Sequence, residues 1–330
     1  MNCPGCGVQV KKNDITNCDQ CGAGLDTQEQ REITAKIEPR KLEEGWRRKA
    51  IESLKANAVV KVGVRTDLGR VRENNEDKFE FFEPDDELAL ATRGAFYAVA
   101  DGMGGHAAGQ IASELALKTV ISSFYSDLTG DLEEALVRAV QQANSLIYDT
   151  AKAIVERSGM GTTLTAAIIR GDDLFVAQVG DSRAYLIRGG KIEQITEDHS
   201  WVAEQVRLGV LTEHEAHSSP FRNVITRSMG TQPGVEPDVW KQRLKEGDVL
   251  VLCSDGLTGN VSADDILGIA GKKDPSPAAR ELVDLANDRG GNDNITVLVL
   301  AVRDIEQVEP QQPKEPKGRG GRLKRLFGGE

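Results

Sequence analysis

The stretch GAFYAVADGMGGHAAG, residues 94–109, joins an apolar run to a turn that is unusually rich in glycine. Its first seven residues have the character of a buried strand. The chain leaves this strand through Asp101, and four glycines and His106 follow within the next eight residues. A plain turn needs one or two glycines. We therefore expect the backbone after Asp101 to come very close to another group.

Acids recur where other apolar runs end or begin. Glu76 and Asp77 stand in RENNED, Asp255 in CSDGLTG and Asp293 in GGNDN. A single acid in such a place is an ordinary turn former or helix cap. Carboxylates that gather at one edge of a sheet repel one another unless a cation neutralises them, and oxygen ligands select hard ions such as Mg²⁺ or Mn²⁺. Together with Asp101, the pattern predicts a metal site.

The composition is that of a globular protein. Of the 330 residues, 39% are hydrophobic and 28% are charged, and the formal net charge is −11. An acidic chain is a poor nucleic-acid binder, because that kind of binding depends on a basic surface. No window approaches 18 consecutive apolar residues, and the N-terminus MNCPGCGVQV lacks the features of a secretory signal. We expect a cytoplasmic location.

The chain divides into four regions by composition. Residues 1–25 hold two cysteine pairs, and residues 26–57 form a polar, charged linker. Residues 58–303 contain apolar strands and amphipathic helices. Residues 304–330 are rich in proline, glycine and charge, and we expect them to be disordered. One large domain between two smaller segments is the predicted organisation.

Within residues 58–303 the strands are joined by short turns, and the helices come in blocks. This arrangement favours antiparallel sheets with helices packed outside them, an α+β fold, over a parallel sheet of βαβ units. The expected strands are 59–66, 78–82, 94–101, 162–170, 173–188, 191–195, 247–256 and 293–303, and the expected helices are 107–125, 131–157, 198–217, 262–270 and 276–289.

Six motifs occur in a fixed order along this region: RVRENNED, VADGMGGHAAG, GMGTTLTAAI, VGDSRAYLIR, CSDGLTG and GGNDNITV. Each motif is weak alone, but six in order are highly specific. From residue 59 to residue 303 the chain resembles the metal-dependent (type 2C) Ser/Thr protein phosphatases, specifically their compact bacterial branch. A P-loop is the main rival interpretation of the glycine-rich stretch, and it is excluded because no GK[ST] follows.

The resemblance implies an antiparallel β-sandwich flanked by helices in four α-β-β-α layers, with a binuclear Mn²⁺ or Mg²⁺ centre at one end. Asp101 would bridge the two ions, and the carbonyl of Gly102 would bind one of them. Asp255 and Asp293 would hold the other ion. Glu76 and Asp77 would serve the first ion, either directly or through water, and the sequence does not distinguish these two alternatives.

The resemblance also implies two residues that act on the substrate. Arg72 lies where the family places its phosphate-binding arginine, and a guanidinium can grip a phosphate through two parallel hydrogen bonds. His106 is the candidate general acid. Many relatives carry a histidine directly after the DG pair, where this chain has Met103, so His106 could instead be a helix N-terminal residue without a catalytic role.

Some relatives bind a third ion with an acid four residues after the equivalent of Asp255, where this chain has Gly259. Glu156 and Asp198 are the remaining candidate ligands beside Asp255. Residues 197–231 resemble the family's flap beside the active site, and its histidines, His199, His214 and His217, are expected to be solvated or structural. Cys253 stands alone in an apolar strand and is expected in the core.

The first four cysteines, Cys3, Cys6, Cys18 and Cys21, form two CxxC pairs separated by eleven residues. Disulfides are the ordinary alternative for paired cysteines, but they are disfavoured in a reducing compartment. Four thiolates at this spacing are typical of tetrahedral Zn²⁺, and so small a unit would fold on binding the metal. We expect a structural zinc ribbon.

The predicted function is the hydrolysis of phosphoserine and phosphothreonine on proteins, opposing a bacterial Ser/Thr kinase. Phosphorylated proteins, including such a kinase, are the expected partners. A phosphoprotein-binding pseudophosphatase and a zinc-ribbon adaptor with secondary phosphatase activity are the alternatives. The tail KGRGGRLKRLF interleaves basic and apolar residues, which would allow contact with an anionic membrane or an acidic partner.

Overall fold

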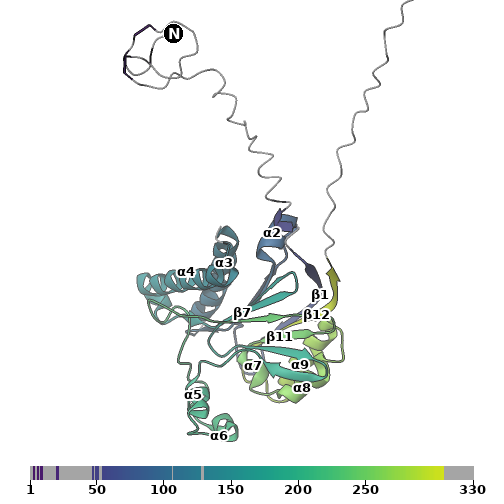
Figure 1. Ribbon diagram of the computed structural model, residues 1–330. Coiled ribbons are helices and arrows are strands. Elements are labelled where there is room, and N and C mark those ends of the chain that lie inside the picture. Colours follow the sequence, from purple (N-terminus) through teal and green to yellow (C-terminus); the bar gives the residue numbers. More distant parts are fainter. Residues whose placement is uncertain are drawn as a thin grey trace, which may run out of the picture. The chain divides into compact units, whose positions relative to one another are not determined.

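The computed structural model describes residues 3, 6, 8, 9, 20, 21, 47, 49–51, 54–105, 107–127 and 130–307. The chain divides into two compact units, residues 1–49 and 50–330. The larger unit contains the strands and helices that position the candidate site (Figure 1).

Two antiparallel five-stranded sheets form the larger unit. The first has the order β1-β12-β11-β8-β9, and the second has the order β10-β7-β6-β3-β2. A short ribbon, β4-β5, lies beyond the end of β3. The strands are β1 (Ala56–Asp67), β2 (Lys78–Phe82), β3 (Ala95–Ala100), β4 (Gly102–Met103), β5 (Gly161–Thr162), β6 (Leu164–Arg170), β7 (Asp173–Val179), β8 (Arg183–Arg188), β9 (Lys191–Gln194), β10 (Asp238–Arg243), β11 (Val249–Cys253) and β12 (Ile295–Gln307).

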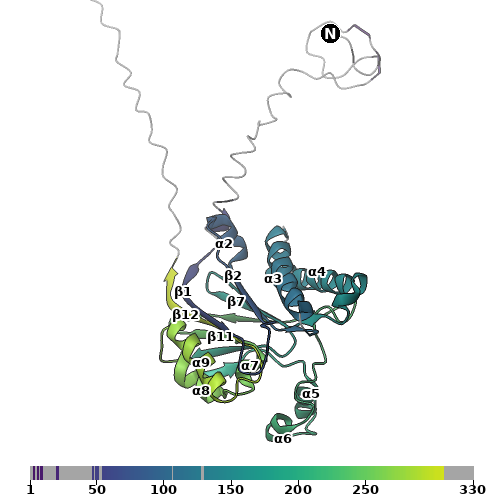
Figure 2. The ribbon, with the colours of Figure 1, turned by 180° about the vertical axis from the view of Figure 1, so that it is seen from behind.

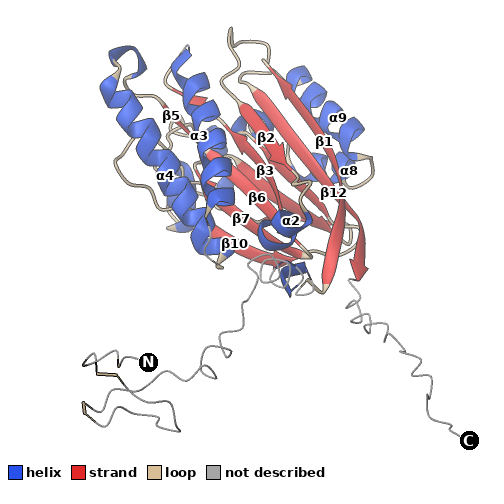
Figure 3. Ribbon diagram, turned by 90° about the horizontal axis from the view of Figure 1, so that it is seen from above, coloured by secondary structure: helices blue, strands red, loops and turns tan. Residues whose placement is uncertain are grey.

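Helices cover the outer face of each sheet, as Figure 3 shows. α3 and α4 lie on the β7-β6-β3 side, and α8 and α9 lie on the β1-β12 side. The helical segments are α2 (Glu87–Arg93), α3 (Ala107–Ser126), α4 (Leu132–Ala153), the 3₁₀ turn η2 (Val155–Arg157), α5 (Trp201–Arg207), α6 (Glu213–Ser218), α7 (Asp255–Thr258), α8 (Ala263–Ala270) and α9 (Pro275–Asp288).

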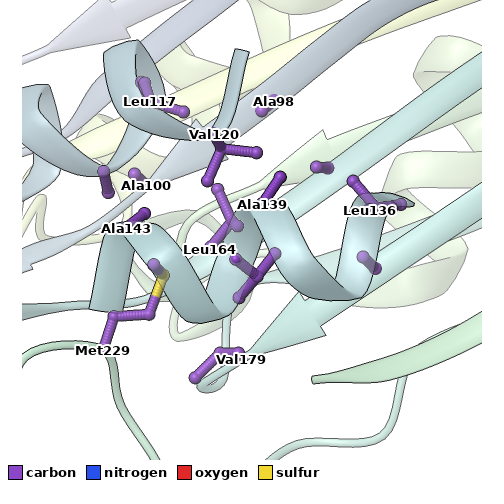
Figure 4. Packing of buried hydrophobic residues seen from close by; sticks show 14 of the residues in the cluster. Ala98, Ala100, Leu117, Val120, Leu136, Ala139, Ala143, Leu164, Val179 and Met229 are labelled. Carbon is purple, nitrogen blue, oxygen red and sulfur yellow. The ribbon is translucent and has the colours of Figure 1, made fainter. Parts of the chain in front are cut away.

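Strand β3 shows why the fold has four layers, because it is buried on both faces. Phe96 and Ala98 belong to the core beneath α3 and α4, whereas Tyr97 and Val99 belong to the core between the two sheets. Successive side chains on a strand point to opposite faces, so an unbroken apolar run is what a central layer requires. Figure 4 shows the α3–α4 core, in which Val120 and other apolar side chains pack over the sheet.

The predicted α-β-β-α sandwich is confirmed, with differences at the element ends. β1 begins at Ala56 rather than residue 59, and β12 continues to Gln307 rather than residue 303, because the two strands pair along their whole lengths. The predicted helix 198–217 is two short helices, α5 and α6, which project from one end of the sandwich (Figures 1 and 2). Helix α2 and strand β10 are not in the prediction.

The largest difference concerns residues 173–188, which the sequence pattern suggested as one strand. The structure breaks this run at Gly180 and Asp181, so that β7 lies in one sheet and β8 lies in the other. Both halves alternate and are apolar, so periodicity alone does not reveal the crossing. The crossing places the turn VGDS at the same end of the sandwich as the motif acids.

Candidate active site

Strand pairing brings the motif acids to one end of the sandwich. Lys78, which follows Asp77, pairs with Ala100, which precedes Asp101. Cys253, at the end of β11, pairs with Val297 of β12 and with Arg183 of β8. The loops that carry the acids are therefore neighbours, although they are far apart in the sequence.

Asp77 is the most completely enclosed of these acids. Its side chain is buried, and its Oδ2 accepts a hydrogen bond of 2.7 Å from the Ser254 hydroxyl. The Ser254 oxygen in turn accepts from the backbone N–H of Thr296 at 3.0 Å. Burial, and then the charges of Asp255 and Asp293, raise the pKa of Asp77 to about 7. The buried Asp77 carboxylate therefore lies within reach of the charges of Asp255 and Asp293.

Asp101 is held by its backbone. Its N–H donates to the Thr163 hydroxyl at 2.9 Å, and its carbonyl accepts from the Thr163 N–H at 2.8 Å and from the Thr162 hydroxyl at 2.9 Å. These bonds leave the carboxylate to face the other acids. Burial, and next the charges of Asp77 and Asp255, raise the pKa of Asp101 well above its ordinary value.

Asp255 and Asp293 complete the group from the β11 and β12 side. Asp255 opens α7, and burial, followed by the charge of Asp293, raises its pKa. Asp293 accepts a hydrogen bond of 2.6 Å at its Oδ2 from Nη2 of Arg72, and at its Oδ1 from the N–H of Asn294 at 2.8 Å. The hydrogen bond to Asp293 is also the main reason that the pKa of Arg72 is raised.

The glycines after Asp101 allow a close approach, as the sequence predicts. A Cβ on Gly102 would lie 2.1 Å from the carbonyl oxygen of Gly109, and a Cβ on Gly109 would lie 1.8 Å from Oε2 of Glu76. No side chain fits at either position. The close neighbour is therefore the start of helix α3, against which the Glu76 carboxylate lies. The backbone of Glu76 is fixed as well, since its N–H donates to Asn294 Oδ1 at 2.8 Å.

The cluster of acids has carboxylate oxygens that are available to ligate a cation. Among the residues that the structure describes, one oxygen of each of Asp77, Asp181 and Asp255 is buried without a hydrogen-bond partner. Buried oxygens of this kind are costly unless a ligand satisfies them. No three carboxylates in the described part of the chain have oxygens within 4.8 Å of one another, so the acids spread over a space wider than one ion's immediate shell. The donor set is all oxygen, which fits Mg²⁺ or Mn²⁺.

Comparison with known proteins decides the family. The family model described as protein phosphatase 2C matches residues 64–295. The chain belongs to the protein phosphatase 2C family.

Individual relatives agree with this assignment. The serine/threonine phosphatase Stp of Listeria monocytogenes is 39% identical over 249 residues, which span 74% of this chain and 96% of that protein. The crystal structure of the Mycobacterium tuberculosis phosphatase PstP/Ppp has a TM-score of 0.67 at 39% identity and covers 74% of this chain and 100% of that chain. A PstP catalytic domain in complex with two manganese ions has a TM-score of 0.66 at 38% identity and covers 75% of this chain and 100% of that chain.

Asp181 is the acid that the sequence analysis missed in this phosphatase domain. It lies in the turn between β7 and β8, it is buried, and its Oδ1 is unpartnered. Burial, and then the charge of Asp255, raise the pKa of Asp181 to about 8. The signal that could have found it is GDS, a glycine, an acid and a hydroxyl within a run interpreted as one continuous strand.

The structure does not favour Glu156 and Asp198 as third-ion ligands. Glu156 is exposed on the 3₁₀ turn after α4. Asp198 uses both carboxylate oxygens in an ion pair with Arg183, which is 2.7 Å away at its closest, and one of them also accepts from Gln194 at 3.0 Å. Asp181 is the acid that has an unpartnered oxygen and whose pKa is raised by the charge of Asp255.

The histidines and Cys253 also have predicted roles that can be compared with their positions in the structure. His106 lies outside the described residues. His199 is buried and hydrogen-bonded at both ring nitrogens, in agreement with a structural role, and His214 is exposed on α6. Cys253 is buried in the core beneath α8 and α9, which confirms the predicted core position. Burial raises the pKa of its thiol to about 12.

The N-terminal cysteines are partly described. Cys3, Cys6 and Cys21 have sulfur atoms that all lie within 4.8 Å of one another, and the Cys3 and Cys21 sulfurs are 3.5 Å apart, too far for a disulfide. Cys18 lies outside the described residues.

In the described part of the chain, no helix is long and apolar enough to span a membrane.

The buried acids make the stability of the metal-free phosphatase depend on pH. The pKa values of Asp77 and Asp181 are about 7 and about 8, above the ordinary value near 3.9 in an unfolded chain. Between the unfolded-state pKa and the folded-state pKa, the folded state binds more protons than the unfolded state. The stability of the folded state therefore falls as the pH rises through this interval. We predict that in EDTA the melting temperature decreases between pH values of about 5 and 8.

Saturating Mn²⁺ should reduce this decrease, because a bound cation replaces the protons. Asp181→Asn should flatten the slope measured in EDTA, whereas Asp264→Asn on the exposed face of α8 should leave it unchanged. A melting temperature that rises over the same interval in EDTA would contradict the arrangement. Thermal unfolding followed by circular dichroism measures all three proteins.

Proposed function

We propose that this chain hydrolyses phosphoserine and phosphothreonine on proteins with two divalent cations, Mn²⁺ or Mg²⁺, held by the acids at the end of the sandwich. The chain is a metal-dependent protein-serine/threonine phosphatase of the protein phosphatase 2C family. The observation that carries the detailed assignment is the group of buried carboxylates with unpartnered oxygens. A pseudophosphatase would have no need to retain such costly groups.

The residues have separate parts in this proposal. Asp101 would bridge the two ions, with Asp77 and the Gly102 carbonyl on one side and Asp255 and Asp293 on the other. Glu76, whose carboxylate lies against Gly109, would act on the first side through water. Bound divalent cations in such a pair lower the pKa of a shared water and offset charge on a phosphoryl group. Asp181 would add a ligand beside Asp255 for a third cation.

Arg72 would bind the phosphate. Its guanidinium is half exposed, at 53% of the side chain, so it can reach a ligand from solvent, and its bond to Asp293 holds it at the edge of the acid group. A guanidinium beside several carboxylates keeps its charge, and it can offer two parallel donors to a phosphate. His106 remains the candidate donor of a proton to the leaving serine or threonine oxygen.

Asp101→Asn tests the bridging role. Replacing one carboxylate oxygen by an amide weakens the ligation of both ions, so we predict a loss in kcat of about 100-fold or more, which corresponds to about 2.7 kcal/mol of transition-state stabilisation. The measurement is hydrolysis of a phosphothreonine peptide with Mn²⁺, with and without EDTA. Asp264→Asn on α8 is the control and should retain full activity. Wild-type rates in the Asp101 variant would exclude a bridging carboxylate.

Arg72→Ala tests phosphate binding. Loss of a charge-assisted contact costs about 1.5–3 kcal/mol, so we predict a KM that rises about tenfold or more while kcat changes less. Arg72→Lys should recover only part of this loss, because an ammonium group lacks the two-pronged geometry. Arg70→Ala, in the same loop and also exposed, is the matched control. An unchanged KM in Arg72→Ala would assign phosphate binding to another group.

The N-terminal cysteines would bind a structural zinc ion. The convergence of the Cys3, Cys6 and Cys21 sulfurs supports this proposal, and Cys18 would be the fourth ligand. The zinc ribbon would act as a docking module for a protein substrate, such as a partner Ser/Thr kinase.

The zinc proposal has its own test. We predict a single zinc ion per chain in the purified full-length protein by elemental analysis, and none after Cys3→Ser together with Cys6→Ser. This double variant should keep its kcat on a small phosphopeptide, because every proposed catalytic ligand lies beyond residue 71. Cys253→Ala should retain the zinc. A severe loss of small-peptide hydrolysis in the double variant would contradict a separate docking role.

A further inference from the structure

His199 is buried at a junction of three segments. Its side chain is 3% exposed, its Nδ1 lies 3.0 Å from the backbone nitrogen of Gly180, and its Nε2 lies 2.8 Å from Oδ2 of Asp238. A backbone N–H can only donate, so Nδ1 must accept and the ring proton belongs to Nε2, which donates to Asp238. The structure therefore specifies one neutral tautomer.

On one side, His199 holds the Gly180 peptide. The N–H of His199 donates to the Gly180 carbonyl at 2.9 Å, so both polar backbone groups of Gly180 bond to the same residue. On the opposite side, a Cβ on Gly180 would lie 2.6 Å from the Thr163 side chain, which itself binds Asp101. Gly180 is thus enclosed between His199 and Thr163, and the next residue is Asp181.

On the other side, His199 closes the base of the segment that carries α5 and α6. The N–H of Thr226 donates to the His199 carbonyl at 2.8 Å, so the two ends of residues 199–226 meet there. Asp238, which accepts the imidazole N–H, also accepts from Nη1 of Arg227 at 2.9 Å. These contacts hold the imidazole in place while its Nδ1 points at Gly180.

We propose that His199 is a positioning residue for the phosphatase reaction, which holds the Gly180 peptide so that the Asp181 carboxylate faces Asp255. The inference rests on the proposed metal-dependent function. Without the Nδ1 acceptor, the buried Gly180 N–H has no partner and the turn relaxes. Divalent-cation binding beside Asp181 and Asp255 then weakens, whereas the bonds that hold Asp77 to Ser254 and Asp101 to Thr163 remain.

Two substitutions of His199 distinguish the role of its Nδ1 acceptor from that of its Nε2 donor. His199→Asn keeps an acceptor oxygen in the position of Nδ1 and removes the donor to Asp238. His199→Gln keeps an amide donor that can reach Asp238 and leaves no acceptor for Gly180. Asp181→Asn marks the effect of losing the carboxylate itself. His214→Asn on α6, where the histidine is exposed, is the matched control.

The readout is Mn²⁺ binding by titration calorimetry, together with the Mn²⁺ dependence of p-nitrophenyl phosphate hydrolysis. We expect His199→Gln to raise the Kd of the weakest Mn²⁺ site by about 10- to 100-fold, the usual range for loss of a group that orients a ligand. Asp181→Asn should affect the same site. His199→Asn should stay close to wild type, as should His214→Asn. Thermal melting in EDTA identifies a temperature at which every variant is folded.

Equal weakening of Mn²⁺ binding in His199→Asn and His199→Gln would overturn the proposal, as would unchanged binding in His199→Gln at that temperature. Unchanged Mn²⁺ binding in Asp181→Asn would show that the turn has no ligand to position. The proposed function fails separately, if the wild-type protein binds Mn²⁺ but does not hydrolyse phosphate esters in its presence.

Discussion

The mutual repulsion of buried carboxylates at one end of the β-sandwich is the constraint on which the site depends. Burial raises the pKa values of Asp77, Asp101, Asp181 and Asp255, and the charges of neighbouring acids raise them further. Such a group is stable near neutral pH only with protons or cations bound. Affinity for divalent cations is thus a direct consequence of how the strands pair, since pairing alone brings these acids together.

Neutral hydrogen-bonding groups keep the acids in place despite this repulsion. The Ser254 hydroxyl holds Asp77, and the Thr162 and Thr163 hydroxyls hold the backbone of Asp101. Asn294 joins two loops, since its Oδ1 accepts from the Glu76 N–H and its Nδ2 donates to the carbonyls of Leu68 and Asn74. None of these groups neutralises a carboxylate, so the negative charge remains available to a cation.

The same physical logic explains the polar residues inside the family's motifs. A small amide or hydroxyl side chain stands beside the acid in RENNED and in CSDGLTG. In GMGTTLTAAI, threonine hydroxyls bind the backbone of Asp101, which lies in another motif. The segment bearing α5 and α6 joins this framework through His199 at Gly180 and through Met229 at Thr162, whose backbone groups exchange two hydrogen bonds. One end of that segment therefore meets the residue before Asp181, and the other end meets a residue that binds the backbone of Asp101.

The sequence by itself determined the fold class, most of the strands and most of the acids that the fold brings together. Continuous apolar runs such as residues 95–100 predict strands buried on both faces, and the acids at their ends predict a metal site. The glycines at 102 and 109 predicted a close approach, which helix α3 provides. These features follow from local periodicity and residue chemistry, which are legible in one dimension.

Tertiary structure alone decided which acids face one another. The crossing at Gly180 and Asp181 from one sheet to the other places Asp181 beside Asp255, but its two halves have the pattern of one strand. The Asp77 carboxylate is buried against Ser254, whereas the Glu76 carboxylate lies against the start of α3. Asp198 forms an ion pair with Arg183. Each outcome depends on which side chain the partner strand presents, and that is set by pairing between residues distant in sequence rather than by any local pattern.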